Sequence, residues 1–283
     1  MVKLTCMVDL HTHSTESDGT LTPEQLVEHA TNEGVTALAL TDHDTCAGIA
    51  AATGAGDELG VQVIPGIEIE VDYSPGTFHL LGLGIYRWRN VLEPALKELA
   101  EHRVARNLLM VQKIQDAGIP ADYKAIMDIA GGSIVGRPHF AQFLMRQGVV
   151  NSVQEAFNRY LAEGKPFYAA RERLSLARSV RLIHEAGGKA VIAHPNSLHL
   201  SATKLQEKLV EWKETGVDGV EAFHSNATYS ECKRYEAMAN ELNLLITAGS
   251  DFHGPHRIDR RLGRTVDNKK IDDAYAAPFL AGA

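Results

Sequence analysis

Two histidines separated by one residue follow a short apolar-biased run near the start of the chain. His11 and His13 come directly after Val8-Asp9-Leu10, and the Ser/Thr/Gly-rich turn that follows contains Asp18. Side chains at positions i and i+2 of a strand point to the same face, so both imidazoles could bind one metal ion. Two exposed histidines on a surface strand are the alternative interpretation. The rest of the sequence has to decide between them.

Further histidines and carboxylates recur where strand-like apolar segments end. Together with the first three residues they make a set of nine: His11, His13, Asp18, His43, Glu68, His79, His194, Asp251 and His253. The strand ends of a parallel α/β sheet meet at one face, so we expect these side chains to converge. His79 begins an arm instead of ending one, but a tight turn at 74–76 would fold it back beside Glu68. Clustered carboxylates need cations, and a His/carboxylate set without thiolate suits Mn, Zn or Fe.

Strand and helix patterns alternate at both ends of the sequence. We expect strands at 8–10, 37–40, 61–70, 78–84, 189–193, 219–223, 244–248 and 262–266, and helices at 23–33, 47–59, 175–186, 203–215 and 229–242. Thr22 reads as the N-cap of the first helix, Pro23 as its first residue and Gly34 as its end. This alternation predicts an α/β enzyme whose site lies at the strand ends.

The middle of the sequence shows only helical patterns. We expect helices at 94–117, 122–130, 138–147 and 152–161, with a glycine-rich loop at 131–139. We therefore predict a metal-binding α/β domain formed by 1–93 and 170–283, and an inserted helical substrate or cap domain at 94–169.

Composition limits the possible partners and compartment. A formal net charge of −8 argues against long nucleic acid as a partner, whereas a small anionic substrate stays possible because local cations can override the net field. Three scattered cysteines do not form a disulfide framework, and the sequence shows neither a leader nor an apolar run of about 20 residues. We expect a cytoplasmic protein that does not bind membranes, and no pattern indicates a protein partner.

Several motifs, in order, resemble one known family. VDLHTHSTESDGTLTP, LALTDHDT, PGIEIE, VIAHP and GSDFHG, spread from Val8 to about Val266, are similar to the PHP (polymerase and histidinol phosphatase) metallo-phosphoesterases. The resemblance implies a distorted, TIM-like (β/α)7 barrel that holds three divalent ions, with Mn²⁺ expected and Zn²⁺ or Fe²⁺ as alternatives.

The same resemblance implies which residues would hold each ion. His11, His13, Glu68 and Asp251 would hold the first, and Glu68 would bridge to a second that His79 and His194 complete. Asp18, His43 and His253 would hold the third; many relatives have histidine where Asp18 stands.

The helical insert with its GRPHFA segment is similar to a bacterial subgroup of this family. That subgroup removes the 3'-phosphate from 3',5'-nucleoside bisphosphates, and some members degrade short RNA from the 5' end. The resemblance implies a phosphomonoesterase acting on such bisphosphates. A 5'-3' exoribonuclease on short oligonucleotides, a histidinol-phosphatase-like enzyme, an amidohydrolase-type hydrolase and a non-catalytic metal-binding domain are the alternatives. We see no strand-end lysine that would bridge two metals as a carbamate, which disfavours the amidohydrolase.

Phosphate ester hydrolysis needs a hydroxide and neutralisation of charge on the phosphoryl oxygens, which two ions about 3.5–4 Å apart supply. We expect a hydroxide that bridges the first two ions, held by Glu68, to attack phosphorus in line. Arg137 and His139 are predicted to contact substrate from the insert, because a guanidinium matches phosphate geometry; a solvated loop arginine is the alternative. His224 either protonates the leaving oxygen or packs behind the ligands.

Two smaller expectations concern the neighbours of the ligands. At most one of Arg257, Arg260, Arg261 and Arg264 is expected to reach the site. Ligand imidazoles usually donate their second N–H to a carboxylate or carbonyl, so Asp9, Asp42 and Asp44 are candidates for that role.

Overall fold

The chain forms two compact units. One consists of Met1–Ala95 and Arg173–Ala283, and the other of Leu96–Glu172. The computed structural model describes residues 6–74, 76–131 and 135–280. Parts of the turn predicted at 74–76 and of the glycine-rich loop predicted at 131–139 lie outside these residues.

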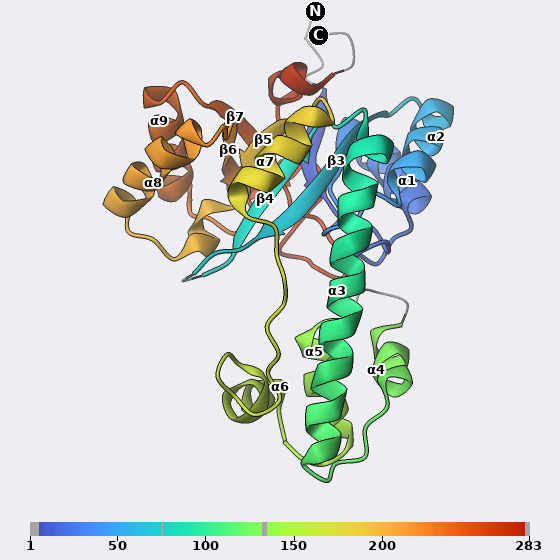
Figure 1. Cartoon of the computed structure of the whole chain (residues 1–283). Helices are drawn as coiled ribbons and strands as arrows, with labels where there is room; N and C mark the ends of the chain where they lie inside the picture. Colours follow the sequence, from blue (N-terminus) through green and yellow to red (C-terminus); the bar gives the residue numbers. More distant parts are fainter. Residues whose placement is uncertain (1–5, 75, 132–134, 281–283) are drawn as a thin grey trace, which may run out of the picture. The chain divides into compact units, whose positions relative to one another are not determined.

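The first unit is built on one seven-stranded sheet whose strands follow one another in chain order (Figure 1). They are β1 (Met7–Thr12), β2 (Val35–Leu40), β3 (Gln62–Val71), β4 (Phe78–Leu83), β5 (Lys189–Ile192), β6 (Gly219–His224) and β7 (Leu245–Gly249). All neighbours pair in parallel except β4, which is antiparallel to β3 and β5. A bridge between Thr12 and Phe252 joins β1 to the chain after β7. The sheet is thus a nearly closed barrel, and the predicted α/β barrel class is confirmed.

Helices cover the outside of this barrel (Figure 1). They are α1 (Pro23–Glu33), α2 (Ile49–Leu59), α7 (Leu176–Glu185), α8 (Ala202–Glu214) and α9 (Tyr229–Glu241). The signals at the ends of α1 act as predicted: the Thr22 hydroxyl accepts from the backbone N–H of Gln25, and Gly34 ends the helix at φ 78°. Short turns η2 (Pro195–Leu198), η3 (Val266–Asn268), η4 (Asp273–Tyr275) and η5 (Ala277–Phe279) complete the unit.

The long helix α3 (Trp88–Asp116) starts six residues earlier than the predicted Pro94. Pro94 lies inside the helix, where it removes one backbone hydrogen bond. Trp88 and Leu92 are buried. We attribute the earlier start to the packing of these side chains, which outweighs the bond lost at the proline. The prediction that the helix begins at Pro94 was wrong.

The strand predicted at 262–266 to close the barrel was also wrong. Only Arg264–Thr265 is extended there (β8), and it pairs with Lys269–Lys270 (β9) in a separate two-stranded sheet. The preceding residue, Gly263, instead donates its backbone N–H to the side chain of Asp9 at 2.8 Å. The Asp9 side chain therefore accepts a backbone hydrogen bond that a neighbouring strand was expected to accept.

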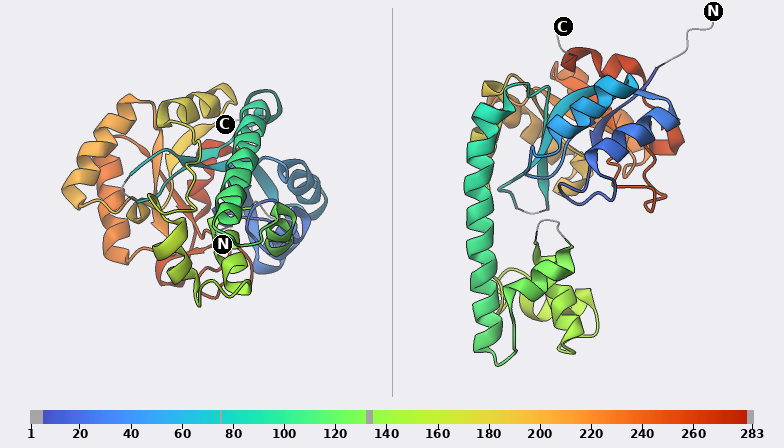
Figure 2. Two further views of the ribbon diagram at one scale, coloured as in Figure 1. Left: turned by 60° about the horizontal axis from the view of Figure 1, so that its bottom comes forward. Right: turned by 90° about the vertical axis from the view of Figure 1, so that its right-hand side faces the viewer.

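The second unit has its own apolar core. The C-terminal part of α3 packs with α4 (Tyr123–Ala130), α5 (Arg137–Arg146), α6 (Val153–Ala156) and the π-helical turn η1 (Phe157–Leu161) (Figure 2). Buried residues of this core include Ile114, Ile126, Phe140, Leu144 and Leu161. None of the helices within the described ranges has the length and apolar character that a membrane span requires.

Candidate metal centre

All nine ligands predicted from the sequence come from one end of the barrel unit, at or just beyond strand ends. His11 lies on β1, Glu68 on β3 and His79 on β4. The other six lie in loops: His13 and Asp18 after β1, His43 after β2, His194 after β5, and Asp251 and His253 after β7. His79 reaches this end because β4 runs antiparallel to β3, which places it opposite Glu70 in the ladder. Eight of these side chains form three groups with metal-ligand spacing. The ninth, His194, joins the group around His79 through its contact with Glu68.

The first group is buried and consists of His11, His13, Glu68 and Asp251. The Nε2 atoms of His11 and His13 face one another at 3.1 Å. Oε2 of Glu68 lies 3.2 and 3.3 Å from these two nitrogens, and Oδ1 of Asp251 lies 3.4 and 3.2 Å from them. Four possible ligand atoms therefore surround one point, as a small cation would require.

Glu68 also belongs to a second group through its other oxygen. Oε1 lies 2.8 Å from Nδ1 of His79 and 2.9 Å from Nε2 of His194. A carboxylate with one oxygen in each of two groups is placed to bridge two ions. His43 lies close to this group as well, because its Nδ1 is 3.1 Å from Oε2 of Glu68.

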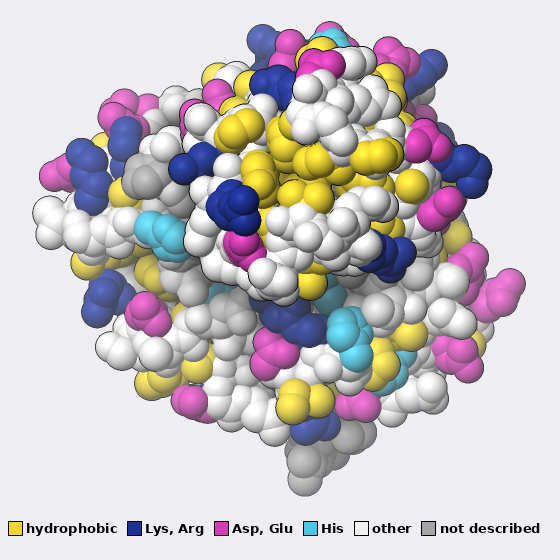
Figure 3. Space-filling view, turned by 90° about the horizontal axis from the view of Figure 1, so that it is seen from below, with side chains coloured by type: hydrophobic (Ala, Val, Ile, Leu, Met, Phe, Trp, Pro, Cys, Tyr) yellow, Lys and Arg dark blue, Asp and Glu magenta, His cyan; other side chains and the backbone are white. Residues whose placement is uncertain are grey.

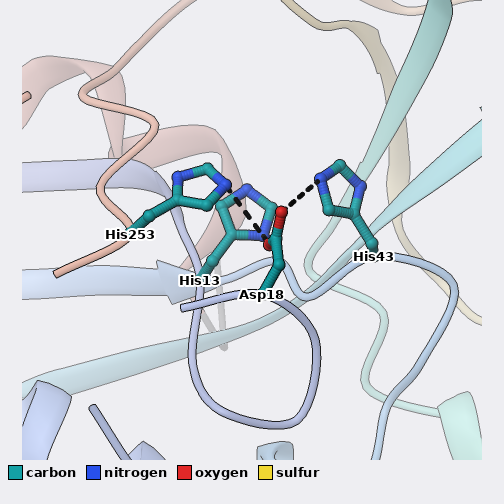
Figure 4. Close-up of side chains that lie close together, drawn as sticks. All are labelled: His13, Asp18, His43 and His253. Carbon is teal, nitrogen blue, oxygen red and sulfur yellow. Dashed lines mark ion pairs between the residues drawn. The ribbon is translucent and has the colours of Figure 1, made fainter. Parts of the chain in front are cut away.

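The third group is more open and gathers around Asp18 (Figure 4). The Asp18 carboxylate lies between the rings of His253 and His43, with 3.2 Å from Oδ1 to Nε2 of His253 and 3.9 Å from Oδ2 to Nε2 of His43. His13 completes the group. The side chain of Asp18 is 54% exposed, so this group borders solvent.

Hydrogen bonds orient two of the ligand imidazoles. Nδ1 of His11 lies 2.9 Å from Oε1 of Glu221; a carboxylate can only accept, so Nδ1 carries the proton and the lone pair of Nε2 faces the first group. The Ser197 hydroxyl donates to the carbonyl of Thr77 at 2.9 Å and therefore accepts from Nδ1 of His194 at 3.0 Å. Nε2 of His194 is then also free to bind a metal ion.

The remaining polar atoms fit the same chemistry. Nδ1 of His253 donates to the carbonyl of Asp251 at 2.8 Å, which turns its Nε2 toward Asp18. Oε2 of Glu68 is buried, and nitrogens of His11, His13 and His43 lie 3.1–3.3 Å from it. A buried carboxylate among several imidazoles needs positive charge beside it, which bound cations or protonated rings supply. The residues present thus fit divalent metal ions.

The carboxylates that the sequence placed beside the ligand imidazoles have other roles. Asp9 accepts from the backbone N–H of His11 and from Ser250, and Asp42 accepts from Ser14 and Ser17. The observed partner of the His11 ring is Glu221, which the sequence analysis missed. Its signal was a single glutamate between the apolar residues Val220 and Ala222 of strand β6.

The charges of the first group favour protonated imidazoles when no ion is bound. Burial opposes protonation, but the carboxylates of Glu221 and Glu68 raise the pKa of His11 well above its usual range. Hydrogen bonds to Asp251 and Glu68 likewise outweigh burial and raise the pKa of His13 to about 10. Burial lowers the pKa of His43 to about 4. Metal ions bind the unprotonated rings, so binding at the first group releases protons.

A cavity of about 550 Å³ borders the three groups. The residues that line it besides the ligands are Thr77, Asn196, Ser197, His199, Asn226, His256, Arg257 and Arg260. Arg260 contacts the Asp251 carboxylate and donates to its carbonyl at 3.2 Å. Two of the four candidate arginines line this cavity instead of the single one expected. On the face seen from below, histidines reach the surface beside basic and acidic side chains (Figure 3).

The other predicted functional residues are His224 in the barrel unit and Arg137 and His139 in the helical unit. His224 is 1% exposed and is not among the described residues that line the cavity. Burial lowers its pKa to about 4, so the position does not favour a general acid. In the helical unit, the Arg137 guanidinium lies 5.8 Å from the ring centres of both Phe157 and Tyr168, and Nδ1 of His139 accepts from the backbone N–H of Gly136. Their contact with substrate stays a prediction, as does a capping role for this unit.

The fold and the site define a class: an α/β-barrel hydrolase with a histidine and carboxylate metal centre. The PHP domain family matches residues 9–168. The chain therefore belongs to the PHP family, as its motifs indicated.

Curated relatives of similar length match most of the chain. A 5'-3' exoribonuclease of Haemophilus influenzae is 35% identical over 252 residues, which is 89% of this chain and 92% of the relative. A 3',5'-nucleoside bisphosphate phosphatase of Chromobacterium violaceum is 33% identical, covering 92% of each chain. A phosphoribosyl 1,2-cyclic phosphate 1,2-diphosphodiesterase of Eggerthella lenta is 34% identical, covering 87% of this chain and 94% of the relative.

Among solved structures, a protein of Bifidobacterium adolescentis described as a metal-dependent phosphoesterase superimposes with a TM-score of 0.76 at 28% identity. The match covers 96% of this chain and 95% of that one. The chain is thus a metal-dependent phosphoesterase, a hydrolase of phosphoric esters. Its relatives act on different phosphate esters at similar identity, so the substrate has to be argued from the site.

Proposed function

We propose that the chain removes the 3'-phosphate from 3',5'-nucleoside bisphosphates, for example adenosine 3',5'-bisphosphate, giving AMP and phosphate. The observation that carries this proposal is the cavity of about 550 Å³ beside the three ligand groups. Small-molecule sites commonly measure about 300–1,000 Å³, which suits a mononucleotide. The name of the C. violaceum relative supports the same substrate class.

The charges around the cavity suit a substrate with two phosphates. Ligand residues line the cavity together with His256, Arg257 and Arg260, and Nη1 of Arg260 lies 3.5 Å from Nδ1 of His253. Guanidinium groups bind phosphate oxygens through paired N–H donors. We infer that the scissile phosphate lies at the ligand groups while Arg257 or Arg260 contacts phosphoryl oxygens. Arg137 and His139 of the helical unit are kept as further substrate contacts.

The chain's own residues hold and orient the reacting groups. His11, His13, Glu68 and Asp251 would hold one ion, Glu68, His79 and His194 a second, and Asp18, His43 and His253 a third. Bound divalent ions supply an activated water and neutralise charge on the phosphoryl oxygens. Arg260 directs the Asp251 carboxylate, because it contacts Oδ2 while Oδ1 faces the two histidines. His43 lies between the second and third groups and could serve either one.

The donor set and the compartment lead to two further proposals. Histidine and carboxylate ligands without thiolate favour Mn²⁺, with Zn²⁺ or Fe²⁺ as alternatives. Within the described residues, Cys6, Cys46 and Cys232 form no disulfide, as expected for a protein of the cytoplasm.

A substrate panel tests the proposal. Purified protein with Mn²⁺ should release phosphate from adenosine 3',5'-bisphosphate with a kcat/KM at least about tenfold above that for histidinol phosphate; a single misplaced polar group is worth that much. The remaining product should be 5'-AMP. The matched control is 3'-AMP, which lacks the second phosphate and should react more slowly.

Two results would overturn the substrate assignment. A preference for histidinol phosphate would place the chain with another subgroup. A higher kcat/KM for short 5'-phosphorylated RNA would make the chain an exoribonuclease, the activity for which the H. influenzae relative is named.

A further inference from the structure

Glu221 is a buried carboxylate whose two oxygens contact two different ligand residues. Oε1 lies 2.9 Å from Nδ1 of His11, and Oε2 accepts from the backbone N–H of His194 at 2.8 Å. The side chain is almost completely buried, at 1% exposed. His11 belongs to the first ligand group, and His194 completes the second. One side chain therefore connects two ion positions without lying in either.

The contact with His11 crosses the strand between them. Glu221 lies on β6, and β7 separates it from the seam where β1 meets the end of the sheet. At Gly249 on β7, an added Cβ would lie 2.6 Å from Oε1 of Glu221 and 2.3 Å from Cβ of His11. Glycine leaves the space that the carboxylate needs to reach across β7. The lack of a side chain at Gly249 therefore allows Glu221 to contact His11.

The contact with His194 holds an unusual backbone conformation. His194 has φ 25° and ψ 73°, although it precedes Pro195. A residue before proline normally adopts an extended conformation, and positive φ is rare in residues other than glycine. Strained residues of this kind persist only where the surroundings fix them. The N–H bond to Glu221 is one such constraint.

We propose that Glu221 is a positioning residue that couples the first and second ion positions. One oxygen fixes the His11 ring with Nε2 toward the ions, and the other holds the backbone that presents His194. This inference rests on the metal-binding role proposed for the two groups. Glu221 is buried, where a carboxylate is costly unless its oxygens are paired, and these two contacts pair both of them.

The variant Glu221→Gln tests the coupling while keeping the side-chain shape. An amide has one acceptor oxygen, so it can accept from His11 or from His194 but not from both. We therefore expect Mn²⁺ affinity to fall by about 10- to 100-fold at the position whose contact is lost, the usual effect of removing a partner of a metal ligand. The melting temperature of the metal-free protein should stay close to that of the control.

Thr247→Val is the matched control. Thr247 is buried on β7 and pairs in register with Glu221, and its hydroxyl has no hydrogen-bond partner among the residues that the structure describes. Both variants therefore change a buried polar side chain at paired positions of β6 and β7, but only Glu221 contacts ligand residues. Unchanged ion affinity at both positions in Glu221→Gln would overturn the proposal.

A measurement on the unaltered protein covers the case in which Glu221→Gln does not fold. In ¹⁵N NMR of the Zn²⁺-loaded protein, the His11 ring should carry its proton on Nδ1 and bind through Nε2. The opposite tautomer would contradict the proposal. If the protein binds its ions in this way but releases no phosphate from bisphosphates, the proposed substrate fails while the role of Glu221 stands.

Discussion

The first and third ligand groups differ in burial and in what orients them. His11, His13, Glu68 and Asp251 are buried, and Glu221 and Arg260 fix two of them from outside the group. The third group depends on Asp18, whose side chain is 54% exposed and lies in a loop. We expect from this difference that the first group holds its ion tightly and that the open group admits solvent and substrate.

Glu68→Gln should have the largest effect, because Glu68 is shared by the first two groups. We expect kcat for the bisphosphate to fall by about 10²- to 10³-fold or more, the range for losing a group that stabilises transition-state charge. Metal content, measured by mass spectrometry, should fall with it.

Glu70→Gln is the matched control for that change. Glu70 lies two residues along the same strand and forms an ion pair with Arg173 at 2.8 Å. Its activity and metal content should stay near wild type. A Glu68→Gln enzyme that keeps both ions and most of its activity would remove Glu68 from the centre of the site.

Changes at Asp18 should have an intermediate effect confined to the open group. Asp18→Ala removes the carboxylate between His253 and His43, and we expect kcat/KM to fall by roughly 10- to 100-fold while the two buried ions remain. Asp18→His supplies a neutral ligand and should recover most of that loss. If Asp18→Ala also lost the buried ions, the distinction between the groups would fail.

The pH dependence of metal stabilisation should separate the groups without any mutation. The pKa of His13 rises to about 10 in the metal-free fold, above the ordinary value of 6.5. Its protonation therefore stabilises the metal-free protein fully below about pH 6.5, and this contribution is lost as the pH rises toward 10. Mn²⁺ competes with that proton, so the rise in melting temperature on adding Mn²⁺ should grow between about pH 6 and 8.5.

His43 should not contribute to this trend, because its pKa is lowered to about 4 and it is neutral over the whole range. Thermal melts with and without metal at several pH values provide the measurement. A metal-induced shift that does not depend on pH would contradict the charges assigned to the buried group.

His224→Gln should have the smallest effect. His224 is buried and does not line the cavity among the residues that the structure describes. We expect kcat to stay within about threefold of wild type, far below the 10²-fold or more expected for loss of a general acid. A flattened limb of the pH–rate profile would instead restore His224 as a proton donor.

Much of the fold was predictable because its signals are local. Thr22, Pro23 and Gly34 mark both ends of α1, and polar residues after apolar runs marked the strand ends. The start of α3 was not predictable from Pro94, since burial of Trp88 and Leu92 overrides the local rule. The expected strand at 262–266 failed because Asp9, distant in sequence, bonds the backbone there.

The ligand candidates were accessible from sequence because most of them end or follow a strand; His79 instead lies at the start of β4, and Glu68 lies within β3. The contacts that orient the ligands were not accessible from sequence. Glu221 lies in the middle of a strand, and its contact with His11 depends on Gly249 in the strand between them. Arg260 reaches Asp251 through a loop without regular structure. Contacts that cross the barrel depend on packing, which periodicity does not record.

Titration of the metal-free protein with Mn²⁺, followed by electron paramagnetic resonance, tests the central claim most directly. The first two ions should bind together and give the spectrum of an exchange-coupled pair, because Glu68 offers one oxygen to each buried group. A third, uncoupled signal should appear only at higher Mn²⁺ and should disappear in Asp18→Ala. Isolated Mn²⁺ signals from the first equivalent onward, with no coupled pair at any concentration, would contradict a shared buried centre.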